Sequence, residues 1–325
     1  MEFQIKVVLL AFVLSVIASI IIIPILRRLK VGQIERDDGP QSHLKKQGTP
    51  TMGGIVIALT IVAITAFLYK MYNVAEPNIA KNLIPLAGVP VGFGLIGFID
   101  DFKKLVFKNT EGLKPAYKMF GLLIVAVAFT LYLVKILSLG TETYIPIIKQ
   151  YINLPIWIYI PFAIFVLLAT TNAINLTDGI DGLSTSVTTI IITALTVISI
   201  ILGVKEVTLL GCTLIGACLG FLLFNLHPAK VFMGDTGSLL LGGAIAGMAL
   251  YLKIPIILIV LAFIPIIETV SVMMQVAYFK KTGNRIFKMA PIHHHFELCG
   301  WKENKIVSIF SIITLILSIV AINII

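Results

Sequence analysis

Two adjacent carboxylates, Asp100 and Asp101, stand at the end of an almost charge-free stretch over residues 83–99. Lys103 and Lys104 follow them directly. Carboxylates at the end of an apolar segment cost free energy unless a cation holds them there. We therefore expect lysine side chains, a metal ion or both to neutralise the pair. The alternative is an ordinary solvated boundary of an apolar span. On a helix, adjacent side chains point about 100° apart, so the two aspartates need not share one task.

Two further polar clusters lie between apolar stretches. Residues 172–183 contain two asparagines and two aspartates, and Asp178 and Asp181 share a face if this segment is helical. A plain connector needs only one or two polar residues, so this density favours a functional site. In residues 225–238, Asp235 precedes a predicted helix whose N-terminal amides favour phosphate or carboxylate. The Asp-Thr-Gly-Ser sequence there is also compatible with a simple helix cap.

The remaining clusters are basic. Residues 43–54 combine two lysines, two threonines and a Gly-Gly pair, which suits either a phosphate cradle or a membrane-flanking loop. His293, His294 and His295 suggest zinc first, but neighbouring side chains diverge and no Cys or other His has ligand spacing. The aspartates favour a hard cation, Mg²⁺ bridging to a diphosphate. The histidines would then donate to phosphate or sugar, or handle protons.

The elements that must position these clusters are membrane helices. Mean hydropathy is +1.03. Charged residues make up 13% of the 325-residue chain, against about 25% in soluble domains. Residues 1–26 lack a basic start and a small-residue cleavage site, so we expect a first span rather than a cleaved signal peptide. The three cysteines form no metal or redox motif. The sequence predicts an all-α polytopic membrane protein, a single domain over residues 1–325.

We expect about ten transmembrane helices, over residues 5–26, 53–69, 83–99, 118–137, 155–172, 185–203, 206–224, 238–252, 254–279 and 306–324. The ninth span is long, with a kink expected at Pro265, and it carries Glu268. Residues 138–154 are compatible with a small hairpin. Most of the 25 basic residues fall in the loops that follow odd-numbered spans. The positive-inside rule therefore places these loops, with the polar clusters, in the cytoplasm and both termini outside. The net charge of +9 does not require a nucleic-acid partner, and we expect none.

Five motifs in order resemble one family. They are Thr-Pro-Thr-Met-Gly-Gly (49–54), Gly-Phe-Ile-Asp-Asp (97–101), Asn-Leu-Thr-Asp-Gly-Ile-Asp-Gly-Leu (175–183), Phe-Met-Gly-Asp-Thr-Gly-Ser (232–238) and Pro-Ile-His-His-His-Phe-Glu (291–297). Together they resemble the polyprenyl-phosphate N-acetylhexosamine-1-phosphate transferases, from about residue 27 to the C-terminus. The histidine loop followed by Gly-Trp-Lys-Glu (300–303) resembles members that use a muramyl-peptide nucleotide, with Cys299 a small departure.

The resemblance implies ten transmembrane helices in the bacterial cytoplasmic membrane, usually as a homodimer, with the active site on the cytoplasmic face. It implies that Asp235 is the principal Mg²⁺ ligand, with Asp100 and Asp101 beside it and His293 also catalytic. It also implies three sets of substrate contacts. Asp181, Asn225 and Phe232 would contact the uridine, and Lys46, Thr51 and Lys104 would contact the phosphates. His294, together with His293, would line the sugar or diphosphate region, and His295, Asn175 and Asp178 would also bind substrate.

The implied reaction transfers phospho-MurNAc-pentapeptide from UDP-MurNAc-pentapeptide to undecaprenyl phosphate, forming lipid I and UMP. The sequence is compatible with two mechanisms. In the first, Asp100 deprotonates the lipid phosphate, which then attacks in one displacement. In the second, a covalent phospho-aspartate forms. One alternative function is a sibling transferase that uses UDP-GlcNAc, which should differ at residues 291–303. The other is a transporter, which is disfavoured because the polar residues gather in loops at one face rather than along a midplane path.

Overall fold

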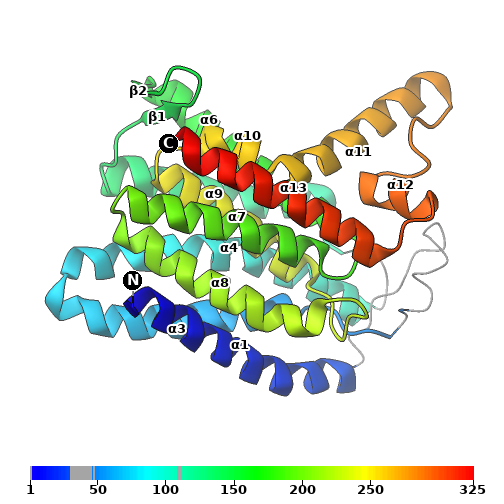
Figure 1. Cartoon of the computed structure of the whole chain (residues 1–325), viewed down its shortest axis with the longest axis horizontal. Coiled ribbons are helices and arrows are strands. Elements are labelled where there is room, and N and C mark those ends of the chain that lie inside the picture. The colour runs from blue at the N-terminus through cyan, green and yellow to red at the C-terminus, as the bar shows by residue number, and fades with distance from the viewer. Residues whose placement is uncertain (1, 30–45, 47, 108–111) are drawn as a thin grey trace.

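The computed structural model describes residues 2–29, 46, 48–107 and 112–325. The chain forms a bundle of long helices (Figure 1). The helices are α1 (Glu2–Arg28), α3 (Gly54–Ala75), α4 (Pro77–Phe107), α5 (Pro115–Leu131), which continues into the π-helical turn η1 (Tyr132–Ile136), α6 (Ile156–Thr177), α7 (Leu183–Ile201), α8 (Lys205–Asn225), α9 (Gly234–Tyr251), the 3₁₀ turn η2 (Pro255–Ile257), α10 (Leu258–Leu261), α11 (Phe263–Thr282), α12 (Ile292–Leu298) and α13 (Glu303–Ile324).

Nine of the described helices are long and apolar enough to cross a membrane, which confirms the all-α polytopic class. The eighth predicted span corresponds to α9, which is not one of the nine. Every residue of α9 from Thr236 to Tyr251 is buried, and α4 and α6 pack along it. Because α9 faces protein rather than lipid, it can be built from Gly and Ala, which allow close helix contacts and lower its hydropathy.

The ninth predicted span is interrupted. Its backbone passes through η2 and α10, and α11 begins at Phe263, directly after Ala262. The predicted kink at Pro265 is therefore a break three residues earlier. The reason is that a proline ring clashes with the carbonyl four residues before it, and here that carbonyl belongs to Leu261. Beyond the break, α11 diverges from α13 toward the end of the bundle that carries α12 (Figure 1).

The two ends of the bundle differ. Both termini lie at one end, together with a hairpin of β1 (Glu142–Ile145) and β2 (Gln150–Asn153), while α12 lies at the other end (Figure 1). The antiparallel register, with Glu142 opposite Asn153, confirms the hairpin predicted over residues 138–154. Lys253 Nζ ties this hairpin to the end of α9 through Glu142 Oε2 at 2.6 Å. The orientation of the two ends across a membrane stays a prediction.

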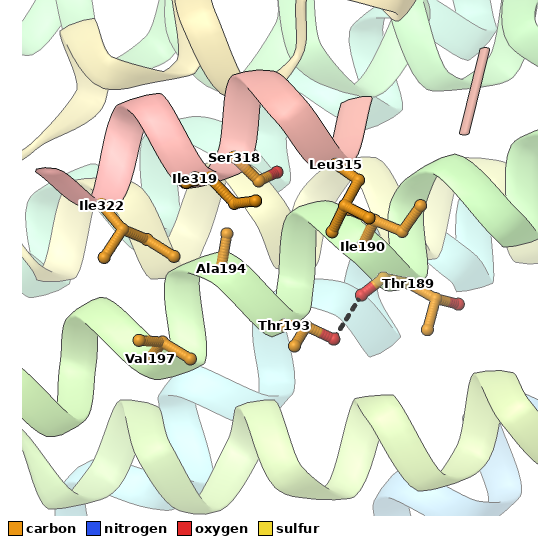
Figure 2. Close-up of a pocket in the computed structure, with 9 residues that line it drawn as sticks. All are labelled: Thr189, Ile190, Thr193, Ala194, Val197, Leu315, Ser318, Ile319 and Ile322. Atoms are coloured by element: carbon orange, nitrogen blue, oxygen red, sulfur yellow. Dashed lines mark hydrogen bonds between the residues drawn. The ribbon is translucent and has the colours of Figure 1, made fainter. Parts of the chain in front are cut away.

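An apolar cavity of about 160 Å³ lies between α7 and α13 (Figure 2). Its lining offers aliphatic side chains and a few hydroxyl groups, and Thr193 donates its hydroxyl to the carbonyl of Thr189 within the helix. No carboxylate, lysine or histidine lines this cavity. The charged groups of the polar clusters therefore lie outside this cavity.

Candidate active site

Three aspartates and two lysines converge where α4, α5 and α9 meet. Lys104 Nζ lies 2.8 Å from Asp100 Oδ2 and 2.8 Å from Asp235 Oδ2. Lys118, from the first turn of α5, also reaches Asp235 Oδ2, at 2.9 Å. Asp100 and Asp101 are only 3% and 4% exposed. Buried carboxylates of this kind are tolerated because the lysines compensate their charge. We call this group the aspartate–lysine cluster.

Asp100 and Asp101 diverge, as their spacing predicts. Asp100 faces the lysines, whereas Asp101 accepts hydrogen bonds from the start of α9. Thr236 donates to Asp101 Oδ2 through its backbone N–H at 2.9 Å and its hydroxyl at 2.7 Å. The backbone N–H of Asp235 donates to Asp101 Oδ1 at 3.3 Å. Asp101 therefore satisfies amides that the first turn of a helix otherwise leaves without partners.

Glycines bring α9 this close to α4. A Cβ atom at Gly97 would lie 2.1 Å from the carbonyl oxygen of Asp235. Gly234 begins α9 with φ +72°, and a Cβ there would lie 2.7 Å from Asp101 Oδ2 and 2.8 Å from Thr51 Oγ1. Only glycine adopts this backbone conformation without strain and leaves room for these neighbours. The predicted residue Thr51 thus lies beside the aspartate–lysine cluster.

The cluster extends into the segment after α6. Asn175 Nδ2 donates to Asp235 Oδ1 at 2.7 Å and to Ser238 Oγ at 2.9 Å. Asp178 follows α6 at its C-cap. Burial, together with the negative charges of Asp235, Asp101 and Asp181, raises the pKa of the Asp178 carboxyl to about 8. The structure therefore brings the predicted residues Asn175 and Asp178 to the same site as Asp235.

A second group of charged residues surrounds Lys46, and we call it the Lys46 cluster. Lys46 Nζ lies 2.7 Å from Asp181 Oδ1 and 2.6 Å from Glu303 Oε2. Asp181 Oδ2 lies 3.0 Å from His227 Nδ1 and also accepts the backbone N–H of Ala229 at 3.0 Å. Although burial opposes the charged ammonium, the hydrogen bonds to Asp181 and Glu303 raise the pKa of Lys46 above its ordinary value.

Lys46 and Lys104 hold different carboxylates. Asp181 and Glu303 are buried and require a cation, which Lys46 supplies. Contact of Lys46 with a substrate phosphate stays a prediction. Residues 43–45 and 47 of the suggested phosphate cradle, with the loop basic residues Lys30, Arg36 and Lys108, lie outside the described residues.

Two of the residues predicted to contact the uridine, Asn225 and Phe232, make contacts within the protein. Asn225 is buried, accepts the hydroxyl of Thr185 at 2.6 Å and donates to the carbonyl of Val231 at 3.0 Å. Asn225 thus holds the loop before α9 in place. Phe232 is half-buried, and its backbone pairs with Pro50 and Gly53 at 2.8 and 2.9 Å. Contact of Asp181, Asn225 and Phe232 with a nucleotide stays a prediction.

The three consecutive histidines have different polar partners, although the rings of His293 and His294 are in contact, with centroids 4.1 Å apart. His293 is fully buried, with Nδ1 3.0 Å from Glu268 Oε2. His294 Nδ1 lies 2.7 Å from Glu297 Oε2, and His295 Nδ1 accepts the backbone N–H of Lys288 at 3.1 Å. Within the described residues, two groups could hold a metal, Asp100–Asp101–Asp235 and Asp181–His227–Glu303, and neither contains a residue of this triplet.

The carboxylates fit a hard cation. The ligand oxygens of Asp100, Asp101 and Asp235 all lie within 4.8 Å of one another. An all-oxygen set of this kind suits Mg²⁺ better than zinc. Three residues of the two clusters were not among the predicted site residues: Lys118, His227 and Glu303. His227 and Glu303 belong to the polar segments 225–238 and 300–303, whereas Lys118 stands at the edge of the fourth predicted span. Glu268, an acid within an apolar span, is a functional candidate for that reason alone.

These features define a membrane-embedded protein with a metal-competent carboxylate and lysine site at one end of its helix bundle. Residues 83–253 match the family model for glycosyl transferase family 4, and residues 46–57 match signature 1 of phospho-N-acetylmuramoyl-pentapeptide-transferase. Phospho-N-acetylmuramoyl-pentapeptide-transferases are also among the relatives of this chain. That of Acetivibrio thermocellus is 47% identical over 95% of this chain and 92% of the relative. That of Caldicellulosiruptor bescii is 46% identical over 97% of this chain and 95% of the relative. That of Clostridium perfringens strain 13 is 49% identical over 97% of this chain and 96% of the relative.

The chain therefore belongs to the phospho-N-acetylmuramoyl-pentapeptide-transferase family. It is a transferase enzyme with multiple membrane helices. The family resemblance carried by the five sequence motifs is confirmed.

Proposed function

We propose that this protein transfers phospho-MurNAc-pentapeptide from UDP-MurNAc-pentapeptide to undecaprenyl phosphate, forming lipid I and releasing UMP. The observation that carries the proposal is the aspartate–lysine cluster, in which Lys104 and Lys118 converge on one oxygen of Asp235. Phosphoryl transfer depends mainly on positioning and on neutralising phosphate charge. The two ammonium groups can position phosphate oxygens, and the three carboxylates can hold a cation that neutralises phosphate charge.

Mg²⁺ is the proposed cofactor. Asp235 would be its principal ligand, with Asp100 and Asp101 beside it. When bound, Mg²⁺ would neutralise charge on the diphosphate of the nucleotide. The lysines would then orient phosphate oxygens, and Asn175 holds the Asp235 carboxylate through its amide at 2.7 Å. Asp101 contributes by holding the first turn of α9, which carries Asp235.

The proposed reaction is a single displacement. An oxygen of the lipid phosphate attacks the β-phosphorus of the nucleotide, the bond from that phosphorus to the bridging oxygen breaks, and UMP leaves with that oxygen. Asp100 takes the proton of the lipid phosphate. A radiolabelled phospho-enzyme formed without lipid acceptor would overturn the single displacement in favour of a phospho-aspartate.

The proposed setting is the bacterial cytoplasmic membrane, with the site on the cytoplasmic face, both termini outside and the single-domain chain paired as a homodimer. The basic loops at the site end support this orientation through the positive-inside rule. The exposed apolar residues of α11, among them Val270 and Met273, are the proposed wall for the lipid tail. Cysteines placed along residues 256–270 should lose solvent labelling when undecaprenyl phosphate binds.

The test is UMP release by detergent-purified protein given undecaprenyl phosphate and Mg²⁺, with UDP-MurNAc-pentapeptide and UDP-GlcNAc in parallel. Release with the muramyl nucleotide alone is the expected result. Release with UDP-GlcNAc would overturn the substrate and keep the family. Asp235→Ala is the matched inactive control, because it removes the oxygen shared by the two lysines.

A further inference from the structure

Glu268 and His293 form a pair that the reaction as proposed does not use. Glu268 lies on α11 and His293 in the first turn of α12, and both side chains are 0% exposed. Glu268 Oε2 lies 3.0 Å from His293 Nδ1 and also accepts the backbone N–H of His293 at 3.4 Å. One carboxylate therefore sets both the backbone position and the ring orientation of His293.

The pair needs a charge balance. An isolated carboxylate inside a membrane protein is costly, and such groups are paired with a cation. Among the described residues, His293 is the side chain capable of positive charge that contacts Glu268. The pairing therefore fixes the ring of His293 with Nδ1 directed at Glu268 and Nε2 on the opposite side.

The Nε2 atom of His293 points at the loop after α6. A Cβ atom on Gly179 would lie 2.1 Å from Nε2, so only glycine leaves room for the ring. Nε2 is buried and has no hydrogen-bond partner among the described residues. A buried polar atom without a partner is rare in native structures and calls for a ligand or water. This one is directed at the segment that also carries Asp178.

We propose that Glu268 is a positioning residue for His293. It holds the ring so that Nε2 faces the Asp178–Gly179 segment, where it forms a hydrogen bond with the bound nucleotide. Carboxylates in other enzymes act on histidines in this way, by fixing the orientation of the ring. The role of Nε2 rests on the proposed function, whereas the state of the Glu268–His293 pair does not.

The kinetic test uses Glu268→Gln, which keeps the shape and an acceptor but removes the charge. The expected result is a 10- to 100-fold lower kcat for UMP release, with little change in the KM for undecaprenyl phosphate. Because both residues act through one hydrogen bond, the double variant with His293→Gln should be no slower than His293→Gln alone. Losses that multiply would overturn the proposal.

Two further variants separate positioning from folding. Ser271→Ala removes another buried polar group of α11, a hydroxyl that donates to the carbonyl of Glu268 at 2.7 Å, and should retain wild-type kcat. Glu268→Asp keeps the charge and should retain more activity than Glu268→Gln. Equal losses in the Asp and Gln variants, or an equal loss in Ser271→Ala, would contradict a charge-dependent role.

A spectroscopic measurement tests the pair without substrate. The chain has five histidines, so ¹⁵N-histidine labelling gives an assignable spectrum, with His293→Gln identifying the signal. The Nδ1 signal of His293 should show the hydrogen bond to Glu268 in wild type, and it should shift in Glu268→Gln. An Nδ1 signal that Glu268→Gln leaves unchanged would overturn the proposal. If wild type released no UMP, the proposed function would fail, while this measurement would still decide the pair.

Discussion

Asp101 accepts two hydrogen bonds from Thr236, one from its backbone N–H at 2.9 Å and one from its hydroxyl at 2.7 Å. This contact attaches the end of α4 to the first turn of α9, and the next residue back is Asp235. One member of the acidic pair thus supports the helix that carries the proposed metal ligand, while Asp100 faces the lysines.

The first prediction concerns this cap. Asp101→Asn should lower the free energy of unfolding by about 1–2 kcal/mol, because an amide replaces a charged acceptor of helix N–H groups. Thr236→Val removes only the hydroxyl bond and should cost less. Thermal unfolding of the purified protein in detergent measures both. An Asp101→Asn protein as stable as wild type would show that the cap contributes nothing.

The second prediction concerns the approach of α4 to α9. Gly97→Ala should lower the free energy of unfolding by about 1–3 kcal/mol and reduce UMP release, because the new methyl group would collide with the backbone of Asp235. Gly88→Ala is the control in the same helix, since a Cβ there meets nothing within 4 Å. Melting temperature and turnover should both fall for Gly97→Ala and stay near wild type for Gly88→Ala.

The third prediction concerns competition between lysine and metal. Lys104 contributes positive charge 2.8 Å from Asp100 and from Asp235. Lys104→Met should therefore bind Mg²⁺ about tenfold more tightly, while turnover falls about 100-fold. Isothermal titration calorimetry with Mg²⁺ alone measures the affinity. Weaker Mg²⁺ binding by this variant would place the ion away from Asp100 and Asp235.

The fourth prediction concerns Asp178, whose pKa is raised to about 8 by burial and by nearby carboxylates. The carboxyl is therefore mostly protonated at pH 7. A cation at Asp101 and Asp235 would lower this pKa, so Mg²⁺ binding should release a proton at pH 7 and almost none at pH 9. Titrations in buffers of different ionisation enthalpy count the protons. Asp178→Asn should reduce the release, and a release that is unchanged in this variant would contradict the assignment.

The fifth prediction compares a buried with an exposed lysine. Lys46→Met leaves Asp181 and Glu303 buried without their cation and should cost about 3–5 kcal/mol of stability. Lys205→Met breaks the exposed pair with Glu76 and should leave the melting temperature near that of wild type. Thermal unfolding in detergent distinguishes them, and equal effects would mean that the Lys46 cluster is not a stabilising contact.

Much of the fold follows from composition and local pattern. Long apolar stretches must become helices in a membrane because each backbone amide then finds its partner within the same segment. Most helices therefore appear where hydropathy predicts them. The exceptions are the span expected over residues 254–279, which is interrupted before Phe263, and α9, which is less apolar because protein surrounds it. The divergence of Asp100 and Asp101 likewise follows from helix geometry. The motifs alone were also enough to identify the family.

The partners of the charged residues were decided by the tertiary structure. Lys46 and Glu303 are 257 positions apart, and Lys104 and Asp235 are 131 apart. Local spacing carries no information about which carboxylate a lysine meets over such separations, so the partners of Lys46 could not be predicted. The pairing of Glu268 with His293 has the same origin. It depends on the break before α11 and on the absence of a side chain at Gly179, and these become significant only when helices from distant parts of the chain pack together.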